Sequence, residues 1–160
     1  ETYRDLLHVE QQVGAEPGWS AATWAREQVS GDPVVLAEIE LADGDEDAAW
    51  RIAKGNGVFT EDLERWSPQR GTVTTLRRLL METEATHPAE VGELWIRMAD
   101  DDVSSSQPSR YNGAVDMVIT GMTILRNAGQ GERAEQFLEW FRTRNTAKRR
   151  LMEKLTAKLG

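Results

Sequence analysis

The stretch SRYNGAVDMVITGMTILRNA, residues 109–128, predicts a long buried α-helix on which the fold depends. Its large apolar side chains recur in steps of four and three, the spacing of one helical face. They are Tyr111, Val115, Val118, Met122 and Leu125. Small residues recur every seven positions on a neighbouring face, where they would let another helix approach closely: Ala114, Gly121 and Ala128. We therefore expect a central core helix rather than the wall of a cofactor pocket.

The two ends of this helix carry recognisable signals. Pro108 suits a first helical turn, because the N–H that proline lacks would have no partner there. Gly129 suits the position after the last turn, where a left-handed backbone is needed. A basic segment that reaches Arg150 follows this glycine.

Helical patterns continue on both sides of the central helix, each bounded by caps, glycines or prolines. They predict helices over Thr2–Val13, Ala21–Ser30, Pro33–Asp43, from Asp45, from Thr60, over Thr72–Ala85, from Pro88, over Glu132–Thr143 and after Asn145-Thr146, which would cap the last one. Periodicity leaves open whether the last two are separate. Since no segment alternates with a period of two, we expect an all-α fold of about eight or nine helices. The economical architecture is one domain over residues 1–160, an irregular α-solenoid of stacked antiparallel helix hairpins that is tetratricopeptide-like.

Composition excludes several classes of function. The chain has no cysteine, which excludes disulfides, thiolate catalysis and cysteine-based zinc sites, and its only histidines are His8 and His87. No apolar run reaches the roughly 20 residues of a membrane helix. No phosphate-binding loop, nucleophile elbow or His-Glu-x-x-His motif is present. We therefore expect a cytoplasmic protein that is not an enzyme, with no catalytic, cofactor-binding or metal-binding residues.

Two features bear on the origin of the chain. It begins with Glu1 rather than Met, as a piece excised from a longer protein would, and no signal peptide is visible. Two stretches also share a helix end, a glycine turn, an acidic start and an alanine on the packing face: residues 41–50 and 125–134. Such internal similarity is typical of helical repeats, although the full tetratricopeptide signature is missing.

The order of these features resembles the C-terminal helical region of bacterial SWIM zinc-finger proteins. The resemblance covers roughly Val35 to Leu155 and is carried by short motifs: residues 41–50, 86–90, 111–115, 129–141 and 148–152. In that family the helical region follows a finger of cysteines and a histidine. This chain has no cysteine, so zinc and nucleic-acid binding are not carried over. The resemblance implies a helical-repeat scaffold.

Charge is unevenly distributed along the chain, whose net charge is −8. Residues 142–158 hold seven basic side chains against one acid, Glu153, while acids cluster at residues 38–47 and at residues 100–102. A basic face would bind phosphates, whereas a solvated helix end is the plainer reading. Asp43, Asp45 and Asp47 alternate, but they lack the glycine and terminal glutamate of a calcium loop, and helix capping explains them.

The chain also has six tryptophans, most of them expected between helices. Trp50 and Trp140 lie off the predicted packing stripes. If exposed, either would be a binding anchor, because tryptophan is enriched at interaction hot spots. The alternative for each is burial against the next hairpin.

These patterns favour a helical-repeat domain that binds another protein. The candidate partner-binding residues are Trp50, Trp140, Arg142, Lys148, Arg149 and Arg150. The alternative is a nucleic-acid-associated module that uses the basic C-terminal helix. An exposed basic face on residues 142–158 would favour that alternative, and pairing with the acids of residues 38–47 would oppose it. The sequence leaves the oligomeric state open.

Overall fold

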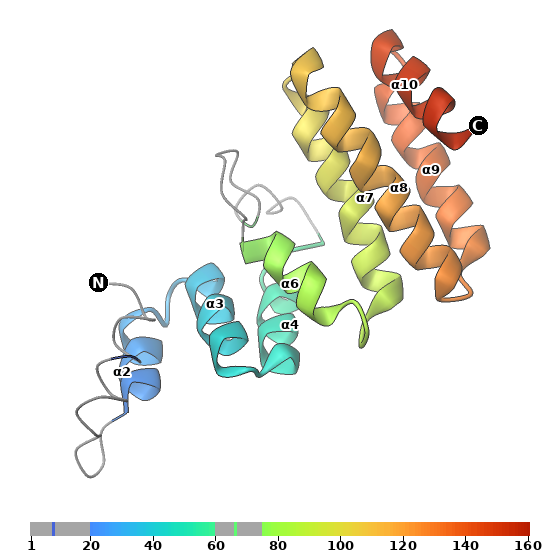
Figure 1. Ribbon diagram of the computed structural model, residues 1–160. Coiled ribbons are helices and arrows are strands. Elements are labelled where there is room, and N and C mark those ends of the chain that lie inside the picture. The colour runs from blue at the N-terminus through green and yellow to red at the C-terminus, as the bar shows by residue number, and fades with distance from the viewer. Residues whose placement is uncertain (1–7, 9–19, 60–65, 67–74) are drawn as a thin grey trace. The chain divides into compact units, whose positions relative to one another are not determined.

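A computed structural model describes residues 8, 20–59, 66 and 75–160 (Figure 1). Within these residues the chain forms eight α-helices and one 3-10 turn and contains no strand, which confirms the predicted all-α class. The chain divides into two compact units, Glu1–Trp66 and Ser67–Gly160. A single domain over residues 1–160 stays a prediction. Apart from residue 8, the predicted helix over 2–13 lies outside the described residues, as does most of the one from Thr60.

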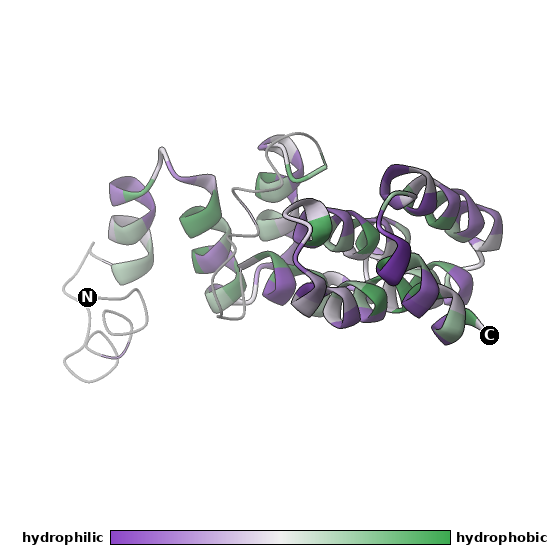
Figure 2. Ribbon diagram, turned by 90° about the horizontal axis from the view of Figure 1, so that it is seen from above, coloured by the Kyte–Doolittle hydropathy of each residue, from purple (hydrophilic) through white to green (hydrophobic). Residues whose placement is uncertain are grey.

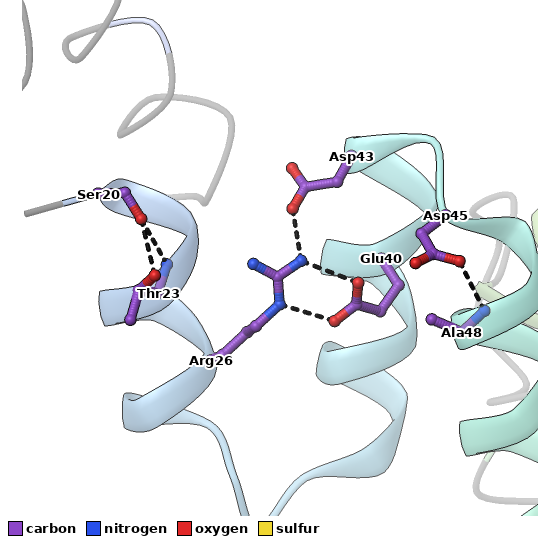
Figure 3. A network of polar contacts seen from close by, with 7 residues as sticks. All are labelled: Ser20, Thr23, Arg26, Glu40, Asp43, Asp45 and Ala48. Carbon is purple, nitrogen blue, oxygen red and sulfur yellow. Dashed lines mark hydrogen bonds and ion pairs between the residues drawn. The ribbon is translucent and has the colours of Figure 1, made fainter.

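The first unit contains three described helices, α2 (Ala21–Gln28), α3 (Pro33–Asp43) and α4 (Glu46–Gly55). Each begins at a capping side chain that accepts a hydrogen bond from a backbone N–H of the first turn. Ser20 accepts from Thr23, Asp32 from Val34 and Val35, and Asp45 from Ala48. Figure 3 shows the first and last of these caps. The predicted starts of these helices are therefore confirmed.

An arginine joins α2 to α3. The Arg26 guanidinium donates to both carboxylate oxygens of Glu40, at 2.7 and 2.8 Å, and to Asp43 at 2.6 Å (Figure 3). The hydrogen bond to Glu40 is the main cause that raises the pKa of Arg26 above its ordinary value. Two acids of the cluster at residues 38–47 are thus bound within their own unit.

The second unit contains α6 (Thr75–Thr83), α7 (Pro88–Ser104), the 3-10 turn η1 (Pro108–Arg110), α8 (Tyr111–Asn127), α9 (Gly131–Asn145) and α10 (Arg149–Leu159). Figure 2 shows hydrophobic and hydrophilic residues on different sides of the helices. The buried core is built around α8, whose predicted stripe from Tyr111 to Leu125 is at most 5 % exposed. Core residues from α7, α9 and α10 complete it, among them Ile96, Phe141 and Leu155.

The backbones of α7 and α8 touch at two glycines. A methyl group built on Gly121 would lie 2.5 Å from the Gly92 carbonyl oxygen, and one built on Gly92 would lie 2.8 Å from the Gly121 carbonyl oxygen. Both distances are shorter than van der Waals contact, so neither position has room for a side chain. The small residue predicted at position 121 therefore serves the close approach of a neighbouring helix, which is α7.

We expect Gly121→Ala to destabilise the second unit by about 1–3 kcal/mol, because the new methyl group forces the backbones of two packed helices apart. Thermal or urea unfolding followed by circular dichroism measures the change. Gly113→Ala is the matched control on the same helix, since a methyl group there meets nothing within 4 Å. The control should be neutral or stabilising by up to about 1 kcal/mol. Equal stability of the two variants would contradict the close approach.

The turns after α3 and α8 have the same hydrogen-bond pattern. Gly44 and Gly129 have φ of 80° and 74°. In each turn the glycine N–H bonds the carbonyl three residues earlier, and the next N–H bonds the carbonyl five residues earlier, as from Asp45 to Glu40 and from Gln130 to Leu125. This is the Schellman pattern that satisfies the last carbonyls of a helix. The two stretches that are similar in sequence thus share a backbone conformation.

We expect Gly129→Ala to cost about 1–2 kcal/mol of stability, because an L-residue is strained in the left-handed conformation. Gly131→Ala is its control, as Gly131 lacks a positive φ and has open space around it. Chemical denaturation of both variants measures the difference. A loss of stability in the control as large as that in Gly129→Ala would argue against the role of the left-handed turn.

The structure corrects the predicted boundary between the last two helices. Helices α9 and α10 are separate, which periodicity alone had left open. The predicted cap at Asn145-Thr146 is wrong, because Asn145 is the last residue of α9 and is 1 % exposed. Helix α10 begins after Lys148 instead. Asn145 is buried because its side chain bonds another helix, as described below.

Candidate functional site

Helices α7 and α9 pack against each other and share one surface. Each helix contributes residues at helical spacing to this surface. Helix α7 contributes Glu93, Arg97 and Asp100, and α9 contributes Arg133, Phe137, Trp140 and Arg144. We call these seven residues the α7–α9 face.

Glu93 is the anchor of one half of this face. Its carboxylate accepts from Arg97 Nε at 3.0 Å and from Arg133 Nη2 at 2.6 Å. The Glu93 side chain is only 9 % exposed. A carboxylate removed from water in this way requires its cationic partners. Glu93 therefore holds both arginines in place, one from each helix.

Asp100 anchors the other half. It accepts from Arg144 Nε at 2.8 Å and from Asn145 Nδ2 at 2.7 Å. The side chain of Asn145 also receives a bond from Lys148 Nζ on its Oδ1, at 2.6 Å. The chain of bonds from Arg144 through Asp100 and Asn145 to Lys148 explains why a polar residue is buried at the end of α9.

Two aromatic rings lie between these anchors. Phe137 and Trp140 pack edge to face with their ring centres 6.0 Å apart. The Arg97 guanidinium lies over both, 5.7 Å from the first ring centre and 5.6 Å from the second. Arg133 lies 6.0 Å from Phe137, and Arg144 lies 5.2 Å from Trp140. Such cation–π contacts hold the guanidinium planes against the rings.

The charges of the face form two layers. The carboxylates lie beneath, with Glu93 at 9 % and Asp100 at 14 % exposure. The guanidiniums lie above, with Arg97 at 31 %, Arg133 at 39 % and Arg144 at 57 % exposure. Solvent therefore meets mainly the guanidiniums and the partly exposed rings of Phe137 and Trp140, with the carboxylates less exposed.

The structure separates the predicted partner-binding residues. Trp50 is 3 % exposed and packs edge to face against Phe59. It is therefore buried and is not an exposed anchor. Trp140 is half-buried within the α7–α9 face. Lys148 joins the same bond network through Asn145. Arg142 is half-buried and is not among the seven residues of that face.

The remaining basic candidates lie on α10. Arg149, with 91 % of its side chain exposed, pairs with Glu153 on the same helix. Lys158 reaches Asp116 at 3.4 Å. Within the described part of the chain, the exposed Arg150 and Lys154 form no ion pair. Pairs as exposed as these are worth little, so α10 presents a mainly basic surface.

Sequence reasoning missed most of the α7–α9 face. Glu93, Arg97 and Arg133 were not singled out, and Arg144 and Asp100 were noted only as members of the basic segment 142–158 and of the acidic cluster at residues 100–102. The signal was present as helical spacing, since Glu93, Arg97 and Asp100 fall on one side of α7, as do the four α9 residues on α9. Matching two polar stripes that are 40 or more residues apart needs the fold.

Among the described residues, no group of three or more histidine, aspartate or glutamate side chains is placed to hold a metal ion. None of the helices found there is both long and apolar enough to cross a bilayer.

Comparison of the chain with known protein families, curated proteins and solved structures finds no match. The resemblance to the SWIM-family helical region stays a prediction.

We expect Glu93→Gln to destabilise the second unit by about 1–3 kcal/mol, because hydrogen bonds to a buried charged group contribute about that much to stability. Glu135→Gln is the matched control, because Glu135 pairs with Arg126 on the surface at 60 % exposure. Exposed pairs contribute about 0–1 kcal/mol, so the control should be nearly neutral. Equilibrium unfolding in urea compares the two variants, and equal losses would contradict an anchoring role for Glu93.

Proposed function

We propose that this chain is a non-enzymatic helical-repeat domain that binds another protein through the α7–α9 face. The observation that carries the proposal is the pair of half-buried aromatic rings, Phe137 and Trp140, held between three arginines on two packed helices. Tryptophan and arginine are the residues most enriched at interaction hot spots. A face whose side chains are already fixed loses little conformational entropy on binding.

The repeat character of the proposal rests on the two shared turns. Gly44 and Gly129 end α3 and α8 with the same pair of backbone hydrogen bonds. This supports an irregular α-solenoid of helix hairpins, tetratricopeptide-like in plan, and it agrees with the proposed relation to the SWIM-family helical region. Proteins of this architecture use extended faces of their helices as binding surfaces. A cytoplasmic location belongs to the same proposal.

A second candidate function is nucleic-acid association through α10. The observation that favours it is the exposed pair Arg150 and Lys154, which form no ion pair within the described residues. Lysine and arginine on one helix face bind phosphates with a strong dependence on salt. The net charge of −8 opposes a long polyanion, which places this candidate second.

Site-specific crosslinking tests the first candidate function. Because the chain has no native cysteine, a label attaches only to the cysteine that is introduced. Gln136 is exposed on α9, next to Phe137 in sequence. We expect Gln136→Cys carrying a photoreactive label to crosslink a discrete protein in lysate, because the label sits beside the aromatic anchors. Mass spectrometry identifies the product, and nuclease treatment should leave it unchanged.

The control places the same label at Thr120→Cys, an exposed position on α8. It should not yield the same product. A product common to both positions would show unspecific capture and contradict the proposed face. A product that disappears on nuclease treatment would move the function to α10 and nucleic acid.

A further inference from the structure

We infer that the α7–α9 face binds a short, extended, acidic segment of its partner protein, with carboxylates of that segment contacting Arg133 and Arg144. This inference rests on the proposed function and adds the chemistry of the partner.

The outer layer of the face is cationic. The two acids that compensate the three arginines are 9 % and 14 % exposed, whereas the outermost arginine, Arg144, is 57 % exposed. A partner therefore meets the guanidiniums first. Complementary charge on the partner raises both the rate and the specificity of association, and a basic segment would meet repulsion.

The arginines keep donors for a ligand. Arg133 uses one Nη2 bond to Glu93, and Arg144 uses its Nε bond to Asp100. A guanidinium has further N–H groups in a fixed fork, and this fork matches a carboxylate. Because the acids below and the rings beside them already fix both guanidinium planes, a ligand carboxylate meets donors that are pre-positioned.

The spacing sets the length of the segment. Arg133 and Arg144 are eleven residues apart on α9, which is roughly 16 Å at the helical rise. An extended peptide advances about 3.3 Å per residue, so about five residues cover this distance. Arg97, Phe137 and Trp140 lie between the two ends. The face therefore fits a segment of about six residues with acids at both ends.

The aromatic rings argue against single-stranded nucleic acid as the ligand of this face. Binding of that kind needs ring faces on which bases stack. Here Arg97 lies over both rings, Arg133 over Phe137 and Arg144 over Trp140. Guanidiniums thus already lie over these rings, where bases would have to stack. Carboxylates require only the outward N–H groups, which remain available.

Fluorescence anisotropy with a labelled peptide, Glu-Glu-Ser-Ser-Glu-Glu, tests the inference on the full chain. We expect the double variant Arg133→Gln/Arg144→Gln to weaken binding by about tenfold or more, the effect of losing about 1.4 kcal/mol or more of charged contacts. The matched control is Arg126→Gln/Arg149→Gln, which removes the same charge from two exposed, ion-paired arginines of the same unit. The control should change binding less than about twofold, as exposed rim charges do.

Further controls keep the result interpretable. A peptide with lysine in place of each glutamate should not bind, and added salt should weaken binding of the acidic peptide. Circular dichroism and thermal unfolding check that each variant is folded. Arg133→Lys/Arg144→Lys keeps the charge but loses the fork, so it should retain part of the affinity even if the glutamine variant is unstable.

Three outcomes would overturn the inference. One is the absence of binding to the folded wild-type chain. Another is equal weakening by the control variant, which would reduce the effect to net charge. The third is tighter binding of a single-stranded oligonucleotide that depends on Arg133 and Arg144. If the label at Gln136→Cys still captures a protein while the peptide fails, the partner chemistry is wrong and the docking face stands.

Discussion

The contact between the backbones of α7 and α8 at Gly92 and Gly121 is the constraint on which the second unit depends. A methyl group at either position would meet the carbonyl oxygen of the facing helix, and a backbone atom cannot rotate away as the end of a side chain can. The crossing fixes α8, whose apolar stripe then receives core residues of α9 and α10. It also fixes the rotation of α7, so that Arg97 points toward α9. The core and the α7–α9 face therefore have a common origin in two residues without side chains.

Local chemistry made much of this fold predictable. The period of residues 109–128, the Asp32-Pro33 start and the glycine after α8 all act within one or two helical turns, and each lies where the sequence predicted it. The pairing of Gly121 with Gly92 was predictable only in part. The small residue was visible, but its partner lies 29 positions earlier on another helix, and no local pattern identifies it. Asn145 shows the same limit, because it looked like a cap and is instead bonded to Asp100 across 45 residues.

The candidate site was less predictable than the fold, because more of its contacts join residues that are distant in sequence. Trp140 was identified because a large aromatic residue off a packing stripe is unusual within one helix. Its arginine neighbours were not, since charged residues at helical spacing are common on any solvated face. Trp50 also lies off a predicted packing stripe, yet it is buried. The position of a residue relative to a stripe does not show which other element packs against it. Exposure is a property of the assembled helices, and the sequence contains it only through contacts between distant positions.

The link of Glu93 to both helices also bears on motion. Packed helices can slide along each other in shear movements, and one helical turn is a displacement of about 5.4 Å. Such a slide of α9 along α7 would bring Phe137 toward the place of Arg133 and leave a nearly buried carboxylate with one cation fewer. The same step would separate Arg144 from Asp100. Because both charge pairs would be lost together, the slide is costly, and we expect the shared surface to behave as a fixed platform rather than a sliding joint.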